Sequence, residues 1–265
     1  MSYTNGLDKP TDYFNTKLYT GNGTDDHAIT GIGFQPDWVW LKNRGSAHHH
    51  RIFDSVRGVT KYLSSSGTGA EVTDSTSLKS FDSDGFTLGT NGAINSNTDT
   101  MVAWNWLASN TTASNTDGSI TSTVSANTTS GFSIVKFTKT DGEVTVGHGL
   151  NAKPSLIIFK PLASANWIVT PEINGSMSNN YLLLHNTDAL GTGGAFSNPT
   201  TSVFSISNNI APNSEHIAYC FANKKGYSKF EKYIGNGNVD GTFVYTGFKP
   251  AMIIIKKNGA GDNWH

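Results

Sequence analysis

The strongest constraint on this chain is a pattern of residues that it repeats three times. The pattern lies at residues 33–42, 150–160 and 247–256, and each copy has a turn, a proline, one variable residue, four large apolar residues and a lysine. Such short apolar runs, rich in β-branched and aromatic residues, favour a strand over a helix. Repetition of this kind indicates a chain built from copies of one structural unit.

Two further landmarks recur in the same order. Residues 101–106 match residues 216–221, and residues 131–137 match residues 226–233. Corresponding landmarks lie roughly 100 to 120 residues apart, a size typical of one β-sandwich. The repeat therefore predicts a docking segment at residues 1–12, a first sandwich module at 13–109, a linker at 110–129, a second module at 130–225 and the start of an incomplete third module at 226–265.

The predicted linker has the composition of a flexible chain. Residues 110–129 consist almost entirely of Ser, Thr, Asn, Ala, Gly and Asp, and only Ile120 and Val124 offer apolar contacts. A segment of this composition cannot bury a core of its own. The second junction, at residues 223–226, is only a turn, so we expect it to be stiffer than the first.

The apolar pattern within each strand predicts which faces are covered. The proline-preceded runs are apolar on both faces, which predicts central strands covered on both sides. Val102, Trp104 and Trp106 alternate with Ala103 and Asn105, and this period of two predicts a strand with its larger residues on the module core. We expect an all-β fold of tandem antiparallel β-sandwich modules, of the jelly-roll or lectin-like kind.

Charge and composition exclude several classes of partner. The formal net charge of −1 gives no electrostatic basis for binding nucleic acid. The first residues lack the basic and apolar regions of a signal peptide, and no apolar run reaches the roughly 20 residues needed to span a bilayer. The single cysteine, Cys220, excludes an intrachain disulfide and lies in an apolar run, so we expect a small buried side chain.

No motif in the sequence predicts a catalytic site, a resident metal or a cofactor. The run His48–His50 could share an ion, but we expect a polar loop before the strand that begins at Arg51. Residues 82–85 resemble a shortened calcium loop without its downstream glutamate. The glutamates are few and do not recur at equivalent positions, which disfavours the paired carboxylates of a glycosidase. Metal binding and glycan hydrolysis remain minor alternatives.

Two tryptophans are candidates for stacking on sugar rings. Trp167 and Trp264 each follow a proline-preceded run and stand beside Asn or Asp. An exposed indole next to such polar groups is suited to carbohydrate recognition. The alternative is that each tryptophan covers the edge of a sandwich.

The landmarks of the first module resemble a known family of modules. Residues 33–45, 52–58, 83–89 and 102–106 resemble the concanavalin- or laminin-G-like sandwiches of fibre and appendage proteins in marine tailed phages. The second module departs from the pattern, with Pro161-Leu162-Ala163 in place of Asn43-Arg44-Gly45. The third shows only its opening.

The resemblance implies a structural, receptor-facing role in a virion and supplies no catalytic residue. We expect a phage fibre or appendage subunit involved in host attachment, assembled in the host cytoplasm and located in the virion. Residues 1–12 would dock to other virion proteins, and the chain would form a homo-oligomer, a trimer by analogy. The alternatives are a carbohydrate-binding module for host surface glycan and, third, a glycan hydrolase.

Overall fold

The computed structural model describes residues 7, 9–193, 196–210, 212–259 and 261–265. These residues form strands with only two short helical turns. The elements are η1 (Pro10–Asp12), β1 (Phe14–Thr20), β2 (His27–Thr30), β3 (Trp38–Asn43), β4 (Arg51–Asp54), β5 (Lys61–Tyr62), β6 (Val72–Thr73), β7 (Leu78–Asp82), β8 (Gly85–Leu88), α1 (Gly92–Asn95), β9 (Thr100–Trp106), β10 (Ala113–Asn115), β11 (Ser122–Asn127), β12 (Phe132–Lys139), β13 (Val144–Gly147), β14 (Leu156–Pro161), β15 (Ile168–Pro171), β16 (Asn180–Leu183), β17 (Gly191–Thr192), β18 (Val203–Ile206) and β19 (Ser214–Phe221).

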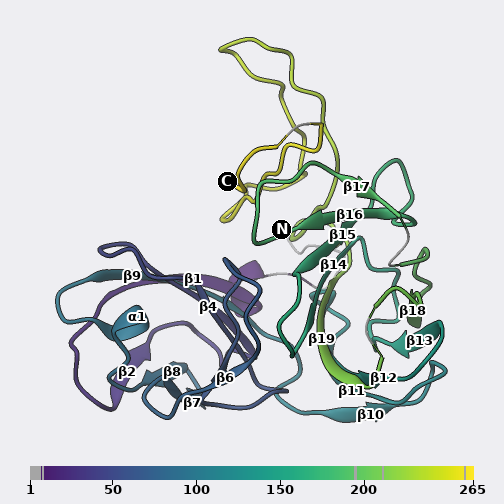
Figure 1. Ribbon diagram of the computed structural model, residues 1–265. Helices are drawn as coiled ribbons and strands as arrows, with labels where there is room; N and C mark the ends of the chain where they lie inside the picture. The colour runs from purple at the N-terminus through teal and green to yellow at the C-terminus, as the bar shows by residue number, and fades with distance from the viewer. Residues whose placement is uncertain (1–6, 8, 194–195, 211, 260) are drawn as a thin grey trace.

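The first sandwich packs a four-stranded antiparallel sheet on a three-stranded one. The strand orders are β1-β9-β3-β4 and β2-β8-β7, with the small ribbon β5-β6 beside them. Its interior is a cluster of buried apolar side chains that includes Val39, Leu41, Phe53, Phe86 and Ala103. In Figure 1 this sandwich forms the purple and blue body on the left.

The second sandwich is built around a larger sheet. Eight strands follow the order β10-β11-β12-β19-β14-β15-β16-β17, and the pair β13-β18 covers one face. Its interior cluster includes Val135, Phe137, Ile157, Phe159 and Phe204. The all-β, sandwich-like fold expected from the repeat is therefore confirmed. Among the described residues, no helix is long and apolar enough to cross a membrane.

Two of the three proline-preceded runs are central strands covered on both sides, as the sequence predicts; the third, at residues 252–255, is not a named strand and is largely exposed. In β3, Val39 and Leu41 point into the first sandwich, whereas Trp38 and Trp40 point out of it. In β14, Ile157 points into the second sandwich and Ile158 points out. Both outward faces are buried because the two sandwiches pack against each other through them.

The strand that carries the alternating pattern is turned the other way from the prediction. Ala103 of β9 points into the first sandwich, while Trp104 and Trp106 pack between the sandwiches. In β19, Cys220 likewise points into its own sandwich and Tyr219 points out. The small side chains leave room for the large aromatic residues of the facing sheet, so size alone misidentified the inner face.

The residues expected to form a linker take part in the second sandwich. Ala113–Asn115 and Ser122–Asn127 form β10 and β11, and β11 pairs with β12 along its whole length. Val124 is buried, and Ile120 packs against the same interior cluster. The linker prediction is wrong here because main-chain pairing with an apolar neighbour can hold a strand that has few apolar residues of its own.

A third cluster joins the two sandwiches, so they are not independent bodies. We call it the interface cluster; its buried members are Trp38, Trp40, Ile52, Leu63, Ala108, Phe132, Ile134, Ile158, Trp167, Val169, Leu182, Ile217, Tyr219 and Phe221. Trp38 lies at its centre, with ring centroids 4.6 Å from Tyr219 and 5.7 Å from Phe132. Each sandwich therefore has its own core and also shares this one with its neighbour.

The two ends of the chain differ from the sandwiches. Residues 1–6 and 8 of the predicted docking segment lie outside the described residues; Leu7 is buried and Pro10–Asp12 form η1. Residues 226–265, which we call the C-terminal segment, contain no named strand among the residues that are described. Figure 1 shows this yellow segment beside the second sandwich, with a long loop reaching away from it.

Candidate functional site

The two tryptophans proposed to stack on sugars lie at boundaries between modules. Trp167 is fully buried, and its indole N–H donates a 2.8 Å hydrogen bond to the carbonyl of Ser64 in the first sandwich. A ring without exposed surface cannot stack on a sugar, so the prediction is wrong for Trp167. Trp264 is half-buried and donates a 2.9 Å hydrogen bond to the carbonyl of Leu183. Glycan stacking on the rest of the Trp264 ring stays a prediction.

Trp167 and Trp264 occupy the same position in the repeat. In each copy the last apolar residue of the run pairs with a residue on the returning chain, as Leu41 with Arg51, Phe159 with Ile168, and Ile255 with His265. The residue directly before that partner is His50, Trp167 or Trp264. The C-terminal segment therefore contains the beginning of the same hairpin that β3-β4 and β14-β15 form.

The carbonyls that accept from these tryptophans are equivalent as well. Ile52 of the first sandwich pairs with Leu63, and its counterpart Val169 of the second pairs with Leu182. Ser64 and Leu183 are the next residues along the chain. The contact between the C-terminal segment and the second sandwich thus repeats the contact between the second sandwich and the first.

Two more hydrogen bonds repeat together with the indole contact. At the first boundary they run from the N–H of Ala165 to Thr68 at 2.9 Å and from the N–H of Glu71 to Leu162 at 2.8 Å. At the second boundary they run from Asp262 to Thr187 at 2.8 Å and from Leu190 to Asn258 at 3.0 Å. Counted from the tryptophans and from their acceptor residues, the positions correspond residue by residue, with one exception. Asn258 lies one residue further from Trp264 than Leu162 does from Trp167, because its hairpin loop is one residue longer. We call this set of three hydrogen bonds the repeated joint.

The lysine that ends each run has a repeated contact of its own. Lys42 donates to the carbonyl of His48 at 2.7 Å, and Lys160 donates to that of Ala163 at 2.7 Å. Lys256 donates to the carbonyl of Asp262 in the C-terminal segment. The lysine therefore holds the hairpin loop in all three copies. Burial, with a contribution from the Arg57 charge, lowers the pKa of Lys160 to about 8.

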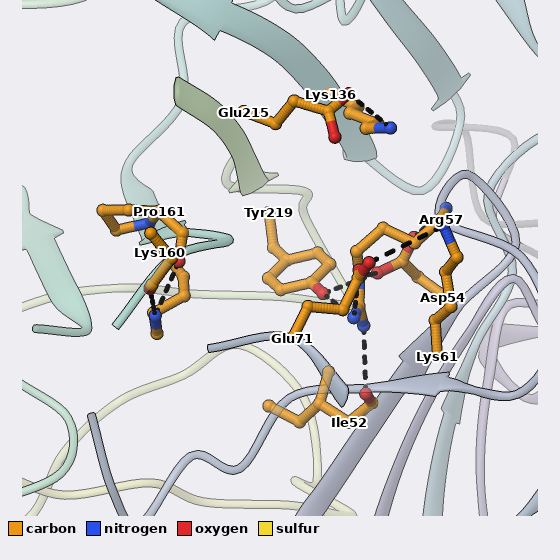
Figure 2. A network of polar contacts seen from close by, with 11 residues as sticks. Ile52, Asp54, Arg57, Lys61, Glu71, Lys136, Lys160, Pro161, Glu215 and Tyr219 are labelled. Atoms are coloured by element: carbon orange, nitrogen blue, oxygen red, sulfur yellow. Dashed lines mark hydrogen bonds and ion pairs between the residues drawn. The ribbon is translucent and has the colours of Figure 1, made fainter. Parts of the chain in front are cut away.

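A buried ion pair adds a polar contact at the first joint only (Figure 2). Asp54 and Arg57 lie three residues apart, and the Arg57 Nε is 2.5 Å from the Asp54 carboxylate. Tyr219, from β19 of the second sandwich, donates a 2.7 Å hydrogen bond to that same carboxylate. The second sandwich has Pro171 at the position of Asp54, since each pairs with the first residue of its proline-preceded strand. The joint can therefore form without this ion pair.

The electrostatics of the ion pair favour a permanent charge on Arg57. Burial disfavours the guanidinium cation and is the largest single effect, but the charge of Asp54, its hydrogen bond and the other groups that face the guanidinium together outweigh burial, so the pKa of Arg57 lies above its usual value. Arg57 also contacts the carbonyl of Ile52 at 3.0 Å and Glu71 at 3.2 Å. Burial raises the pKa of the Tyr219 phenol, which therefore stays protonated and donates a hydrogen bond to Asp54. These groups satisfy one another and hold the two sandwiches together.

The other candidate groups lie apart from the joints. His48 and His49 are exposed in the loop before β4, while burial lowers the pKa of the half-buried His50 to about 4. Among the described residues, no three His, Cys, Asp or Glu side chains gather closely enough to hold an ion. A shallow open hollow of about 380 Å³ lies over β15 and β16, lined in part by Asn166, Tyr181 and Asn209.

Sequence reasoning missed the ion pair and the joint. Asp54 and Arg57 stand in the run Ile52–Gly58, and the resemblance of this run to phage modules implies no role for either charge. A carboxylate and a guanidinium three residues apart in an apolar context could have indicated a buried pair. To predict the joint, one would have to know that Ile52 pairs with Leu63. No local pattern shows this pairing, because the strand β5 beside Leu63 has only two residues.

Comparison with known proteins gives a family for the chain and nothing more specific. Neither curated proteins nor solved structures give a match. A family described as a domain of unknown function, DUF7483, matches residues 9–265. The matched span covers both sandwiches and the C-terminal segment as one unit. The chain therefore belongs to the DUF7483 family.

Proposed function

We propose that this chain is a structural subunit of a phage virion, in a fibre or appendage that contributes to host attachment. The observation that carries the proposal is the repeated joint, in which Trp167 and Trp264 make the same contact to successive modules. A joint used twice in one chain is suited to setting modules in a fixed series. The resemblance of residues 33–45 and 52–58 to appendage modules of tailed phages supports the same role.

The joint suits a load-bearing part better than a mobile one. The interface cluster is apolar and largely buried. The Asp54–Arg57 pair beside it is buried too, and neither side chain is exposed to solvent. Breaking a buried ion pair by removing one partner costs about 3–5 kcal/mol. Two sandwiches fixed in this way would hold their relative orientation under the forces of adsorption. A homo-oligomer, trimeric by analogy, would extend the same rigidity across chains.

The test is location in the particle. Antibodies against the purified chain would be applied to purified virions of the encoding phage and followed by electron microscopy with gold labelling. We expect label at a defined appendage and the chain in the protein inventory of the particle. Presence in infected-cell extract together with absence from purified particles would reject the proposal.

A second candidate function is carbohydrate binding, favoured by the hollow over β15 and β16. Its lining combines the Tyr181 ring with the amides of Asn166 and Asn209, a combination that suits a sugar face and its hydroxyls. A host-glycan array would be probed with the intact chain and with Tyr181→Ala. If Tyr181→Ala abolishes glycan binding, the result would favour this function. If the variant binds as the native chain does, the hollow is excluded as the sugar-binding site.

A further inference from the structure

The positions that line the hollow in the second sandwich carry different chemistry in the first. Three residues that line the hollow are Ile168, Tyr181 and Leu183. The strand pairings that align the two hairpins place Arg51, Tyr62 and Ser64 at the same positions of the first sandwich. The tyrosine is common to both. Where the second sandwich has two apolar side chains, however, the first has a cation and a hydroxyl.

The guanidinium of Arg51 is held in place but has no partner for its charge among the described residues. Its central carbon lies 4.1 Å from the centre of the Tyr62 ring, and the residue is half-buried. Nε is buried and makes no hydrogen bond within the described chain. Arg57, by contrast, has ion pairs with Asp54 and Glu71. Because buried donors are satisfied in nearly all proteins, the Arg51 guanidinium is a candidate for an external acceptor.

The carboxylates of the adjoining segments are engaged elsewhere. Glu71 forms ion pairs with two other cations. Asp99 accepts hydrogen bonds from Asn43 and Ser46, and these bonds lower its pKa. Within the described part of the chain, neither carboxylate forms an ion pair with Arg51. The positive charge of Arg51 is therefore not neutralised by the chain around it.

Hydroxyl and imidazole groups stand beside Arg51. The bridge between the adjacent residues puts Ser64 opposite Arg51, and side chains that stand opposite each other share one face. The hydroxyl of Ser66 is 3.5 Å from that of Ser64 and 2.8 Å from Nδ1 of His49. The carbonyl of Ser64 accepts from Trp167, so the first joint fixes this stretch of chain. Polar groups are thus held in a set position around the cation.

We propose that Arg51, with the hydroxyls of Ser64 and Ser66, binds the oxyanion of an acidic saccharide, either a carboxylate or a sulfate ester. We call these three residues the Arg51 site. A guanidinium presents a planar fork of N–H donors that matches such an oxyanion, and the two hydroxyls add further donors.

The Arg51 site and the hollow divide the ligands between them by charge. The hollow has an uncharged lining and suits a neutral sugar, whereas the Arg51 site takes an acidic one. That the oxyanion belongs to a saccharide rests on the carbohydrate-binding function proposed for the hollow. The affinity of Arg51 for an oxyanion rests only on its own surroundings.

The test measures the binding of three ligands to the intact chain by isothermal titration calorimetry. They are an oligogalacturonate, a sulfated oligogalactan and a neutral oligogalactan. We expect an acidic ligand to bind, and the stronger of the two identifies the oxyanion as carboxylate or sulfate. Arg51→Gln should weaken that binding by about tenfold or more, because charge-assisted hydrogen bonds are lost. Arg51→Lys keeps the charge but not the fork, so it should also bind more weakly than the native chain.

Two control variants separate the Arg51 site from other parts of the chain. Arg44→Gln removes the same charge from an exposed arginine in the loop before β4, so binding of the acidic ligand should be unchanged. Tyr181→Ala alters the hollow and should leave that binding unchanged as well. Circular dichroism shows whether each variant keeps the native fold.

Several results would overturn the proposal. Equal losses in Arg44→Gln and Arg51→Gln would reduce the effect to net charge. Loss of the acidic ligand in Tyr181→Ala but not in Arg51→Gln would place that ligand in the hollow. Binding of the neutral ligand alone, abolished by Tyr181→Ala, would support the function proposed for the hollow and reject the Arg51 site.

A titration with sodium sulfate tests the oxyanion separately from the sugar. The NMR signal of the Arg51 Nε–H reports on it, and we expect a saturable shift that Arg44→Gln retains. A shift with sulfate, together with no binding of either acidic oligosaccharide, would reject the saccharide as the ligand. No shift with sulfate and no acidic ligand bound would reject the site itself.

Discussion

The phenol of Tyr219 donates a hydrogen bond of 2.7 Å to the carboxylate of Asp54, although 165 residues separate them and they belong to different sandwiches. The contact lies within an otherwise apolar interface, where the local dielectric strengthens a charged hydrogen bond. Its acceptor is also held by Arg57, so one carboxylate joins a hairpin of the first sandwich to the central strand of the second.

Replacing Tyr219 by Phe tests that contact with little change in volume. The variant loses one hydrogen bond to a charged acceptor, so the free energy of unfolding should fall by about 1.5–3 kcal/mol. Urea denaturation followed by tryptophan fluorescence measures the change. Tyr245→Phe is the control, because Tyr245 is exposed, and it should leave the midpoint unaltered. An equal midpoint for both variants would contradict the role given to Tyr219.

Removing Arg57 should be more damaging than removing Tyr219. Arg57→Met leaves the buried Asp54 without its cation, at an expected cost of about 3–5 kcal/mol. Adding Asp54→Asn to Arg57→Met removes the stranded charge, so the double variant should be more stable than the single one. Thermal melts of the native chain, of Arg57→Met, of Asp54→Asn and of the double variant decide this. A double variant whose loss equals the sum of the two single losses would mean that the charges are not coupled.

Trp167→Phe should loosen the first joint without unfolding either sandwich core. The change removes the N–H that donates to Ser64 and leaves space in the interface cluster. Large-to-small changes of a buried aromatic side chain cost a few kcal/mol, typically less than about 5 kcal/mol. We expect small-angle scattering to show a larger radius of gyration, with near-native circular dichroism. Trp264→Phe is the matched change at the second joint and should leave the two sandwiches unaffected.

The buried His216 makes stability depend on pH in a defined direction. Burial lowers its folded-state pKa to about 4, against an unfolded value near 6.5. The unfolded chain therefore binds a proton between pH 6.5 and 4 that the folded chain does not, and stability falls as the pH falls through this range. The loss attributable to this group is about 3 kcal/mol at most.

The variant that tests this dependence is His216→Phe. The imidazole stacks between Phe137 and Phe159, with centroid distances of 5.4 and 5.1 Å, so a phenyl ring suits the same space. Urea midpoints at pH 7 and pH 4.5 should differ less in the variant than in the native chain. The same pH dependence in both proteins would assign the effect to other groups, of which His50 is the first to examine.

The sequence predicted the strands well because their signals are local. The run Trp38–Leu41 is apolar on both faces, and it forms a strand covered on both sides. It did not predict which neighbour covers which face: Trp104 was expected to face the module core and instead lies between modules. When both faces of a sheet are buried, the size of a residue does not tell which face of the strand it lies on.

The less predictable parts depend on contacts between distant residues. Residues 113–115 and 122–127 look like linker by composition, yet they form β10 and β11 because β12 offers a free edge. Trp167 looks exposed because small polar residues precede it, yet Ser64, more than one hundred residues away, covers it. In both cases tertiary pairing overrides a weak local signal.

The repeated joint also has a direction. Each later module reaches back with its tryptophan to a carbonyl of the earlier one, so donor and acceptor surfaces are different and do not pair with themselves. A heterologous contact of this kind gives a ring if successive rotations close and a helix with unlike ends if they do not. Any array of such modules therefore has two unlike ends. Its pitch or closure is fixed by one rotation, the one that carries the contact of Trp167 with Ser64 onto the contact of Trp264 with Leu183.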